Sequence, residues 1–395
     1  MKNIFKSQIK FSIIAASFFI FTACGGGGGG GSSSSSSNET DTSITTTQEN
    51  SAQATDYSKY AWNINEFIDS NYKSTYKIDD DAHINLSTAW NTTKGKKSNA
   101  EAIKVAIIDE GFEVSHPEIK DQIFATYNVM TGTTDVSNTS TSTFSHGTAV
   151  AGVIASKYLG VAPEAQLILI NIDLLDDYQS SSTLTEADLI SAFQKAVDLG
   201  AQVINCSWGG GTVSGILSAK IQELKDKNIT VVFSAGNDSS NLDLDGTTDE
   251  SELSSVIGVG ASSVENDITS YSNYGSQIDL IAPAGGNTTD GLLGILSLDL
   301  TGTNGINTST QLGLVNYNYS FVQGTSFSAP TVSGVVALLL AAKPTLTADE
   351  IRQILIDTAD KVGTSNGADY SVNNFDVKRA YGKINAGNAV TEALK

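Results

Sequence analysis

The chain has 395 residues, which suits one large domain or two small ones, and 40% of them are apolar, enough to bury a core and to exclude a disordered chain. It carries 43 Asp and Glu against 23 Lys and Arg, a formal net charge of −20, and a surface this acidic repels phosphate backbones and excludes a nucleic-acid partner. Two cysteines are too few for a disulfide scaffold or a cysteine-ligated zinc site.

The first 23 residues have the pattern of a secretory signal peptide. A basic start, 1–10, precedes an apolar run, 11–23, that is too short to span a bilayer. The small residues before Cys24 resemble the processing site of bacterial lipoproteins, at which the cysteine is freed and acylated. We therefore expect 1–23 to be a lipoprotein signal peptide with lipidation at Cys24; an ordinary cleaved signal with a chance cysteine is the alternative.

Residues 24–55 have the composition of a flexible tether. Runs of glycine and serine follow Cys24 and lead into a stretch rich in Thr, Ser and Asn, which cannot form a packed core. We expect an extracytoplasmic lipoprotein attached to a membrane through Cys24. Gly25 rather than Asp after the cysteine favours the outer membrane or cell surface. An acylated Cys24 leaves Cys206 without a disulfide partner, so we expect Cys206 to be a buried, small apolar side chain.

From about residue 56 the chain alternates predicted strands and helices, and 56–395 is expected to be a single domain. Short apolar runs predict strands at 103–108, 166–172, 203–207, 229–234, 256–261 and 279–282. Helical spacing and caps predict helices at 146–156, from a capping box at Thr185 to Gly200, at 213–227, at 326–342 and from Thr347 onward. This alternation is typical of an α/β domain with a mostly parallel β-sheet and helices on both faces.

Four polar residues stand where such folds form sites, outside the carboxyl ends of strands. Asp109 and Asn237 each come just after a predicted buried strand, and His146 begins a run of small residues that lets a helix pack closely. Pro330 belongs in a first helical turn, which puts Ser326 near a helix start, where backbone N–H groups favour developing negative charge. Singly, each has a plainer interpretation: a turn aspartate, a packing histidine, a serine cap and a turn amide.

Together, the order Asp, His, Ser matches the catalytic triad order of subtilisin. The sequence resembles the subtilisin-like serine proteases (subtilases) over roughly 57–392. The matching segments are VAIIDEG at 105–111 with HPE at 116–118, HGTAVAG at 146–152, VINCSWGG at 203–210, SAGN at 234–237 and GTSFSAP at 324–330.

The resemblance implies a serine endopeptidase that acts on polypeptides without a cofactor for its chemistry. Ser326 is then the nucleophile, His146 the base, and Asp109 the residue that orients the imidazole, while Asn237 and the Ser326 N–H form the oxyanion hole. We expect a monomer. The implied substrate-binding residues are Ser207, Trp208 and Gly209, along which a peptide adds as a strand, together with Ser234, Ala235 and Gly236.

Two features depart from the family pattern. Glu110 stands where the family usually has Ser or Thr, and it raises the pKa of His146 if it points inward. Roughly 60 residues separate the tether from Asp109, and 84–90 looks like part of the catalytic domain, so we expect no full inhibitory propeptide. A mature amino terminus between about residues 80 and 100 would contradict this expectation.

The predicted specificity pocket falls in an acidic segment. By the resemblance, its floor falls near Thr248, Asp249 and Glu250. Acids there favour a basic side chain before the scissile bond, but we expect them to be solvated loop charges or calcium ligands. The segment 243–250 has the hard oxygens that calcium prefers, and structural calcium is common in the family, but the metal site is unassigned.

Three other functions are alternatives to the protease. An esterase or lipase would use a Gly-x-Ser-x-Gly elbow and the order Ser, Asp, His, whereas Ser326 lies in Gly-Thr-Ser-Phe-Ser and comes last, which disfavours that class. A catalytically silent surface binding protein should have lost a triad or oxyanion residue, and none is missing. A peptide ligase or cyclase on the same fold stays open, because these motifs do not determine whether water or an amine resolves the acyl-enzyme.

Overall fold

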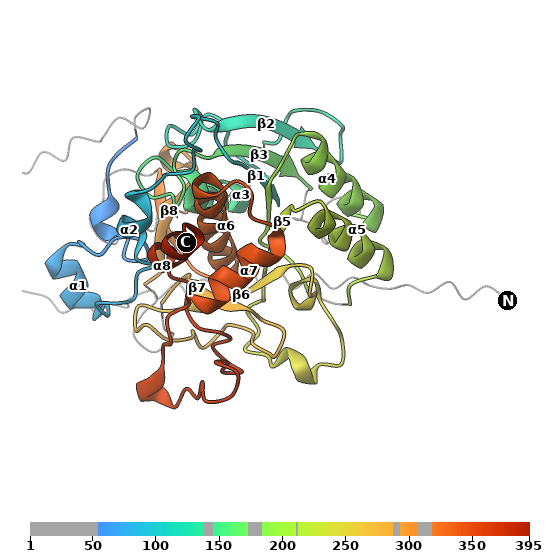
Figure 1. The fold of residues 1–395 in the computed structure, drawn as a ribbon. Coiled ribbons are helices and arrows are strands. Elements are labelled where there is room, and N and C mark those ends of the chain that lie inside the picture. Colours follow the sequence, from blue (N-terminus) through green and yellow to red (C-terminus); the bar gives the residue numbers. More distant parts are fainter. Residues whose placement is uncertain (1–53, 138–144, 173–183, 211, 287–292, 307–317) are drawn as a thin grey trace, which may run out of the picture.

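The computed structural model describes residues 54–137, 145–172, 184–210, 212–286, 293–306 and 318–395. The predicted signal peptide, Cys24 and nearly all of the predicted tether lie outside these residues. A seven-stranded parallel sheet forms the centre, in the order β2-β3-β1-β4-β5-β6-β7 (Figure 1). Its strands are β1 Lys104–Asp109, β2 Ile123–Asn128, β3 Gln166–Asn171, β4 Val203–Cys206, β5 Thr230–Ser234, β6 Ile257–Ser262 and β7 Leu280–Pro283.

The central strands are apolar on both faces because each face carries its own core. In β1, Val105 and Ile107 belong to one apolar cluster, while Ala106 and Ile108 belong to another. Successive side chains of a strand point to opposite faces, so a continuous apolar run is what a doubly covered sheet requires. The predicted α/β fold with a parallel sheet is confirmed.

Helices α4 and α5 cover one face, and α3, α6 and α8 lie on the other (Figure 1). Helix α6 is long and apolar enough to cross a membrane, but 89% of it is buried, so it is the central helix of the larger core. The helices are α1 Ser70–Tyr76, α2 Leu86–Trp90, α3 His146–Ala155, α4 Glu186–Asp198, α5 Gly215–Asp226, α6 Thr325–Ala342, α7 Ala348–Asp357 and α8 Ala386–Ala393.

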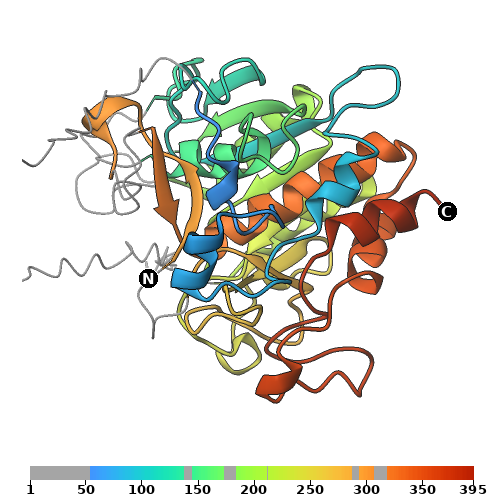
Figure 2. The same ribbon diagram turned by 90° about the vertical axis from the view of Figure 1, so that its left-hand side faces the viewer.

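The predicted elements agree with the structure to within one or two residues at each end. Thr185 caps α4 through the expected capping box, and Gly200 follows that helix with φ +82°. The sequence analysis missed β2, which is a half-exposed edge strand without a continuous apolar run. It also missed the antiparallel pair β8 Ile295–Leu298 and β9 Tyr319–Val322, which lies apart from the main sheet (Figure 2). Each of these strands has four residues, too few for a periodicity to be read.

The residues before β1 pack into the larger core. Trp62 is buried and its Nε1 donates to Gly294 O at 2.9 Å, and Tyr57 stacks edge-on against Tyr319. Helix α2 packs against α8 near the carboxyl end of the chain. This packing supports the interpretation of 84–90 as part of the same unit as the sheet.

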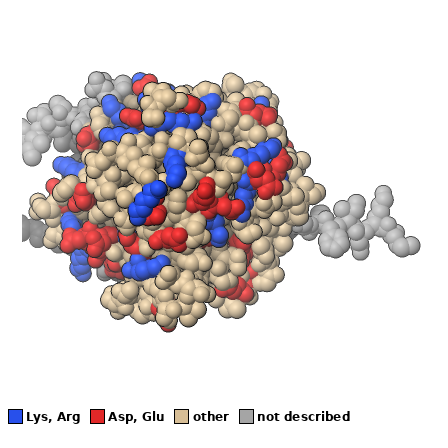
Figure 3. All heavy atoms as spheres, viewed as in Figure 1, with Lys and Arg blue, Asp and Glu red and all other residues tan. Residues whose placement is uncertain are grey.

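The distribution of charged side chains can be followed on one face of the molecule. On the face shown in Figure 3, basic and acidic side chains are interspersed, without a continuous basic surface of the kind that binds nucleic acid. Cys206, the one cysteine among the described residues, is fully buried at the end of β4, and burial raises the pKa of its thiol. Its prediction as a small core side chain is confirmed.

Candidate active site

Asp109 and His146 form a direct pair at the carboxyl edge of the sheet. Asp109 is the last residue of β1 and is fully buried; His146 is the first residue of α3. The His146 Nδ1 and Asp109 Oδ1 lie 2.7 Å apart, and Asp109 Oδ1 also accepts from the Glu110 N–H. Asp109 Oδ2 is buried without a hydrogen-bond donor among the described residues. The positive charge of a protonated imidazole is therefore the strongest stabilising partner available to this carboxylate.

The close packing of α3 on the strand end comes from Gly147 and Ser145. The Gly147 N–H donates to Glu110 O at 3.0 Å, and a Cβ on Gly147 would lie only 2.5 Å from that oxygen. Ser145 caps the helix by accepting from the Thr148 N–H. A larger residue at 147 would push the helix away, so the run of small residues is what brings His146 to Asp109.

His146 sits in a strongly acidic environment. Burial lowers its pKa, but the charge and hydrogen bond of Asp109 and the charge of the buried Glu110 outweigh burial and raise the pKa to about 9. The conditional prediction for Glu110 is confirmed in its direction. A base with this pKa is mostly protonated at neutral pH and becomes competent as the pH rises.

We expect Glu110→Gln to shift the pH profile of activity. Removing this carboxylate lowers the pKa of His146, so the acid limb of kcat/KM, expected near pH 9, should move to lower pH by on the order of one unit. The profile is measured with a peptide substrate at low ionic strength. Glu164→Gln, an exposed residue beyond the opposite end of the sheet, is the matched control and should leave the limb in place. A limb that does not move in Glu110→Gln would contradict the assigned electrostatics.

Ser326 is the second residue of α6 and is partly exposed. Gly324 precedes the helix with φ +125°, a conformation that side chains disfavour, and this sharp turn presents Ser326 at the helix start. The Ser326 N–H lies in the first turn, where backbone N–H groups have no partner within the helix. The ring centroids of Phe327, the next residue, and His146 lie 5.5 Å apart. The start of α6 is therefore beside the Asp109–His146 pair.

Pro330 lies inside α6 rather than in its first turn, so that part of the sequence prediction is wrong. The conclusion drawn from it, that Ser326 is near the helix start, is correct. Pro330 has no N–H to donate to the carbonyl four residues earlier, which belongs to Ser326. The Ser207 hydroxyl donates to that carbonyl instead, at 2.6 Å.

Ser207 and Ser326 are joined by two hydrogen bonds. The Ser207 carbonyl accepts from Ser326 Oγ at 3.1 Å, while its hydroxyl accepts from Asn205 Nδ2 at 3.0 Å. Asn205 in turn accepts from the Ser333 hydroxyl of α6. Sequence reasoning placed Ser207 at the substrate edge and missed this positioning network, because its members are separated by up to 128 residues in the chain.

Asn237 is oriented by the start of α6. Its Oδ1 accepts from both the backbone N–H and the hydroxyl of Thr325, at 2.8 and 3.0 Å. Because two donors occupy the oxygen, the Nδ2 group is directed to the other side of the amide, where it can donate. Thr325, which no sequence argument singled out, therefore positions the predicted oxyanion donor.

The remaining predicted substrate residues lie on the two strand ends that flank Ser326. Trp208 is buried: its indole donates to Ile108 O at 2.7 Å and packs edge-on against Phe233, so only its backbone is available to a peptide. Gly209 is partly exposed. Ser234 and Ala235 are buried at the end of β5, and the Gly236 N–H donates to the hydroxyl of Thr325.

The other two histidines lie outside the site. His116 is fully buried; its Nε2 lies 3.1 Å from Asn318 O and its Nδ1 accepts from the Glu118 N–H. Burial lowers the pKa of His116 to about 4, which keeps it neutral in the core. His83 accepts from the Asn85 N–H in a turn before α2.

The acidic segment 243–250 is exposed at Asp243 and Asp245 and buried at its end. Asp249 and Glu250 are buried, so the description of them as solvated loop charges is wrong. The carboxylates of Asp243, Asp245 and Asp249 each accept from nearby backbone N–H and hydroxyl groups. Among the residues that the structure describes, no three acidic, histidine or cysteine side chains are grouped to hold a metal ion.

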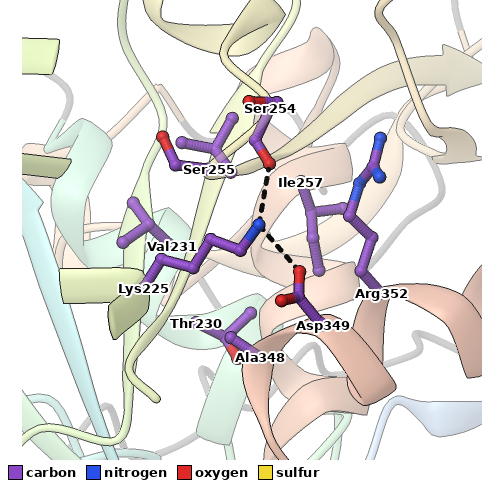
Figure 4. A pocket seen from close by; sticks show the side chains of 10 residues that line it. Lys225, Thr230, Val231, Ser254, Ser255, Ile257, Ala348, Asp349 and Arg352 are labelled. Carbon is purple, nitrogen blue, oxygen red and sulfur yellow. Dashed lines mark hydrogen bonds and ion pairs between the residues drawn. The ribbon is translucent and has the colours of Figure 1, made fainter. Parts of the chain in front are cut away.

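A small pocket lies at the opposite, amino-terminal end of β5 and β6, between these strands and α7 (Figure 4). It has room for about one water molecule. Lys225 crosses it to pair with Asp349 at 2.7 Å and to donate to Ser254 O. Arg352, which also lines the pocket, pairs with Asp279 instead. The pocket is remote from the carboxyl edge that carries Asp109 and Ser234.

Comparison with known proteins gives one consistent result. The pattern of the subtilase family matches residues 100–382. Subtilisin DY of Bacillus licheniformis is 32% identical over 67% of this chain and 85% of its own length. A calcium-dependent protease of Trichormus variabilis is 31% identical over 79% of this chain and 49% of its own length. Fervidolysin of Fervidobacterium pennivorans, a keratinolytic enzyme, has a similar structure, with a TM-score of 0.64 and 25% sequence identity. The match covers 85% of this chain and 47% of the fervidolysin chain. The first curated relatives are longer, and this chain covers 42 to 64% of their length.

Proposed function

The chain belongs to the subtilase family, and we propose that it is a serine endopeptidase that hydrolyses peptide bonds in polypeptides. One observation carries the proposal: the 2.7 Å pair of His146 and Asp109 lies beside a helix start that presents Ser326, with an oriented amide, Asn237, next to it. These are the parts that acyl transfer requires, namely a nucleophile, an oriented base and donors for an oxyanion.

In the proposed acylation step, Ser326 Oγ attacks the carbonyl carbon while His146 Nε2 takes the hydroxyl proton. Asp109 holds the Nδ1–H and stabilises the imidazolium that forms. The tetrahedral oxygen accepts from Asn237 Nδ2 and from the Ser326 N–H. The C–N bond then breaks, and the leaving amine receives the proton from His146. In the second half of the reaction, His146 takes a proton from water, and the water oxygen attacks the acyl carbon. The bond to Ser326 Oγ then breaks, and Ser326 Oγ receives the proton from His146.

The proposed substrate is an extended peptide. The backbone of 207–209 leaves β4 beside the nucleophile, and it can pair with a peptide strand through N–H and C=O groups. Polypeptides without fixed structure can adopt this extended shape most readily, so unfolded casein is a suitable first substrate.

The purified full chain tests the proposal with casein and a fluorophosphonate probe. We expect cleavage of casein and covalent labelling of the protein. The summed mass of the products should exceed that of the substrate by one water for each broken bond. Products joined through new amide bonds would indicate a ligase or cyclase. A folded protein that neither cleaves nor labels would contradict the proposal and favour a surface binding protein.

We further propose that the chain is an extracytoplasmic lipoprotein anchored through Cys24, and the support for this is the sequence of 1–37. We expect Cys24→Ser to abolish incorporation of a labelled fatty acid and to move the protein from the membrane fraction to the soluble one. Cys206→Ala is the matched control and should leave both unchanged, since Cys206 is buried in the core. Unchanged lipid labelling in Cys24→Ser would contradict the anchor.

A further inference from the structure

Glu250 is a buried carboxylate beside the backbone segment that is proposed to bind substrate. It begins a short 3₁₀ helix, Glu250–Glu252, which packs against β5 and β6. The residue is 7% exposed, and its Oε2 accepts from the Gly210 N–H at 3.4 Å. The same oxygen lies 3.3 Å from the position that a Cβ on Gly209 would occupy. Its carboxylate therefore faces the segment that follows β4.

The geometry around Ser326 defines where a substrate side chain enters. The segments that leave the neighbouring parallel strands β4 and β5 lie on either side of the nucleophile, one providing Ser207 and the other Asn237. A substrate peptide would pair with 207–209, and the Asn237 amide would hold its scissile carbonyl. In that position, the side chain of the residue before the scissile bond points between the segments that leave β4 and β5. Leaving out Gly209 itself and its two chain neighbours, Glu250 Oε2 is the one described atom within 4 Å of the position that a Cβ on Gly209 would occupy. Glu250 Oε2 therefore lies beside Gly209, on the side where a substrate side chain would pass.

In the part of the chain that the structure describes, the Glu250 carboxylate has no cationic partner. Among the described residues, no lysine or arginine forms an ion pair with it. Burial raises the pKa of Glu250 to about 7; N–H groups of Glu250 and Gly210 oppose this increase, and the charge of Asp249 adds to it. A buried carboxylate that lacks a counter-ion is costly, and an arriving cation recovers part of that free energy.

Resting on the proposed protease function, we propose that Glu250 is a specificity-determining residue that selects lysine or arginine immediately before the scissile bond. The long aliphatic stem of either side chain can lie along Gly209, which has no side chain of its own, while the charged end reaches the carboxylate. An apolar side chain in the same space would leave the Glu250 charge buried and unpaired.

Peptide substrates that differ only in the residue before the scissile bond test the inference. We expect the full chain to cleave a lysine substrate at least tenfold better in kcat/KM than its phenylalanine counterpart. Glu250→Gln should lose about 10- to 100-fold on the lysine substrate while the phenylalanine rate holds or rises. Rates are normalised to active sites counted with the fluorophosphonate probe.

Glu252→Gln is the matched control. Glu252 lies on the same short helix and accepts from the Asp249 N–H, a contact that glutamine retains, so the lysine-to-phenylalanine ratio should not change. Cut sites mapped in casein with the unmodified protein give an answer that does not depend on folding of a variant. Labelled protein that prefers phenylalanine, or a Glu250→Gln variant with an unchanged ratio, would overturn this inference alone. Absence of labelling would overturn the proposed protease function and this inference with it.

Discussion

Ser326→Ala is expected to abolish proteolysis, with a loss of about 10⁶-fold in kcat. The change removes the one atom that attacks the carbonyl, while the Asn237 amide and the helix start remain. Casein cleavage and fluorophosphonate labelling should disappear together. Peptide binding should persist, because the backbone segment at Ser207 is unaltered, and it can be measured as a thermal shift with a slowly cleaved peptide.

Ser328→Ala is the matched control for this variant. Ser328 lies one turn or less further along α6, and its hydroxyl donates to Ala282 O at 3.0 Å, away from the nucleophile. Its loss should cost stability on the order of 1 kcal/mol and leave labelling intact. A Ser326→Ala protein that is still labelled, or that still cleaves casein at a measurable fraction of the normal rate, would show that another residue is the nucleophile.

Asp109→Asn is expected to lower kcat by about 10⁴-fold with little change in structure. An amide at 109 would donate to His146 Nδ1 and so fix the proton on Nε2, where the base must instead accept one. It would also remove the charge that stabilises the imidazolium, and that charge raises the pKa of His146. The measurement is kcat for a peptide substrate at saturating concentration, across the pH range.

The matched control is Asp121→Asn, which removes the same charge from an exposed turn before β2. Its kcat should match that of the unmodified protein. If Asp109→Asn kept most of its activity near pH 9, the pair seen between Asp109 and His146 would be structural rather than catalytic.

Most of the fold could be predicted because local sequence and tertiary environment agree. Strand β1 is apolar from Val105 to Ile108, since it is covered on both faces, and Thr185 and Thr347 begin helices with complete capping boxes. Strand β2 escaped prediction for the opposite reason, because one face is exposed and its residues are mixed.

The residues proposed for catalysis could be found because each stands at a turn that constrains the sequence. Position 147 requires glycine because the backbone at Glu110 passes close by, and position 324 favours glycine because its φ is positive. These constraints make the neighbouring His146 and Ser326 stand out in the sequence. The positioning groups carry no such mark. Asn205, Ser207 and Thr325 are ordinary polar residues until the fold brings β4, β5 and α6 together.

The sequence alone predicted the parallel sheet, because periodicity and capping are local properties. It indicated Asp109, His146, Ser326 and Asn237 through their order and through motifs that resemble those of the subtilases. Only the tertiary structure decided the environment of the charges. It buried Glu110 near His146 and Glu250 against Gly209, where low solvent exposure turns a side chain that looks like a surface charge into one that acts on its neighbours. Burial and pairing depend on residues far away in the chain, and no local pattern encodes them.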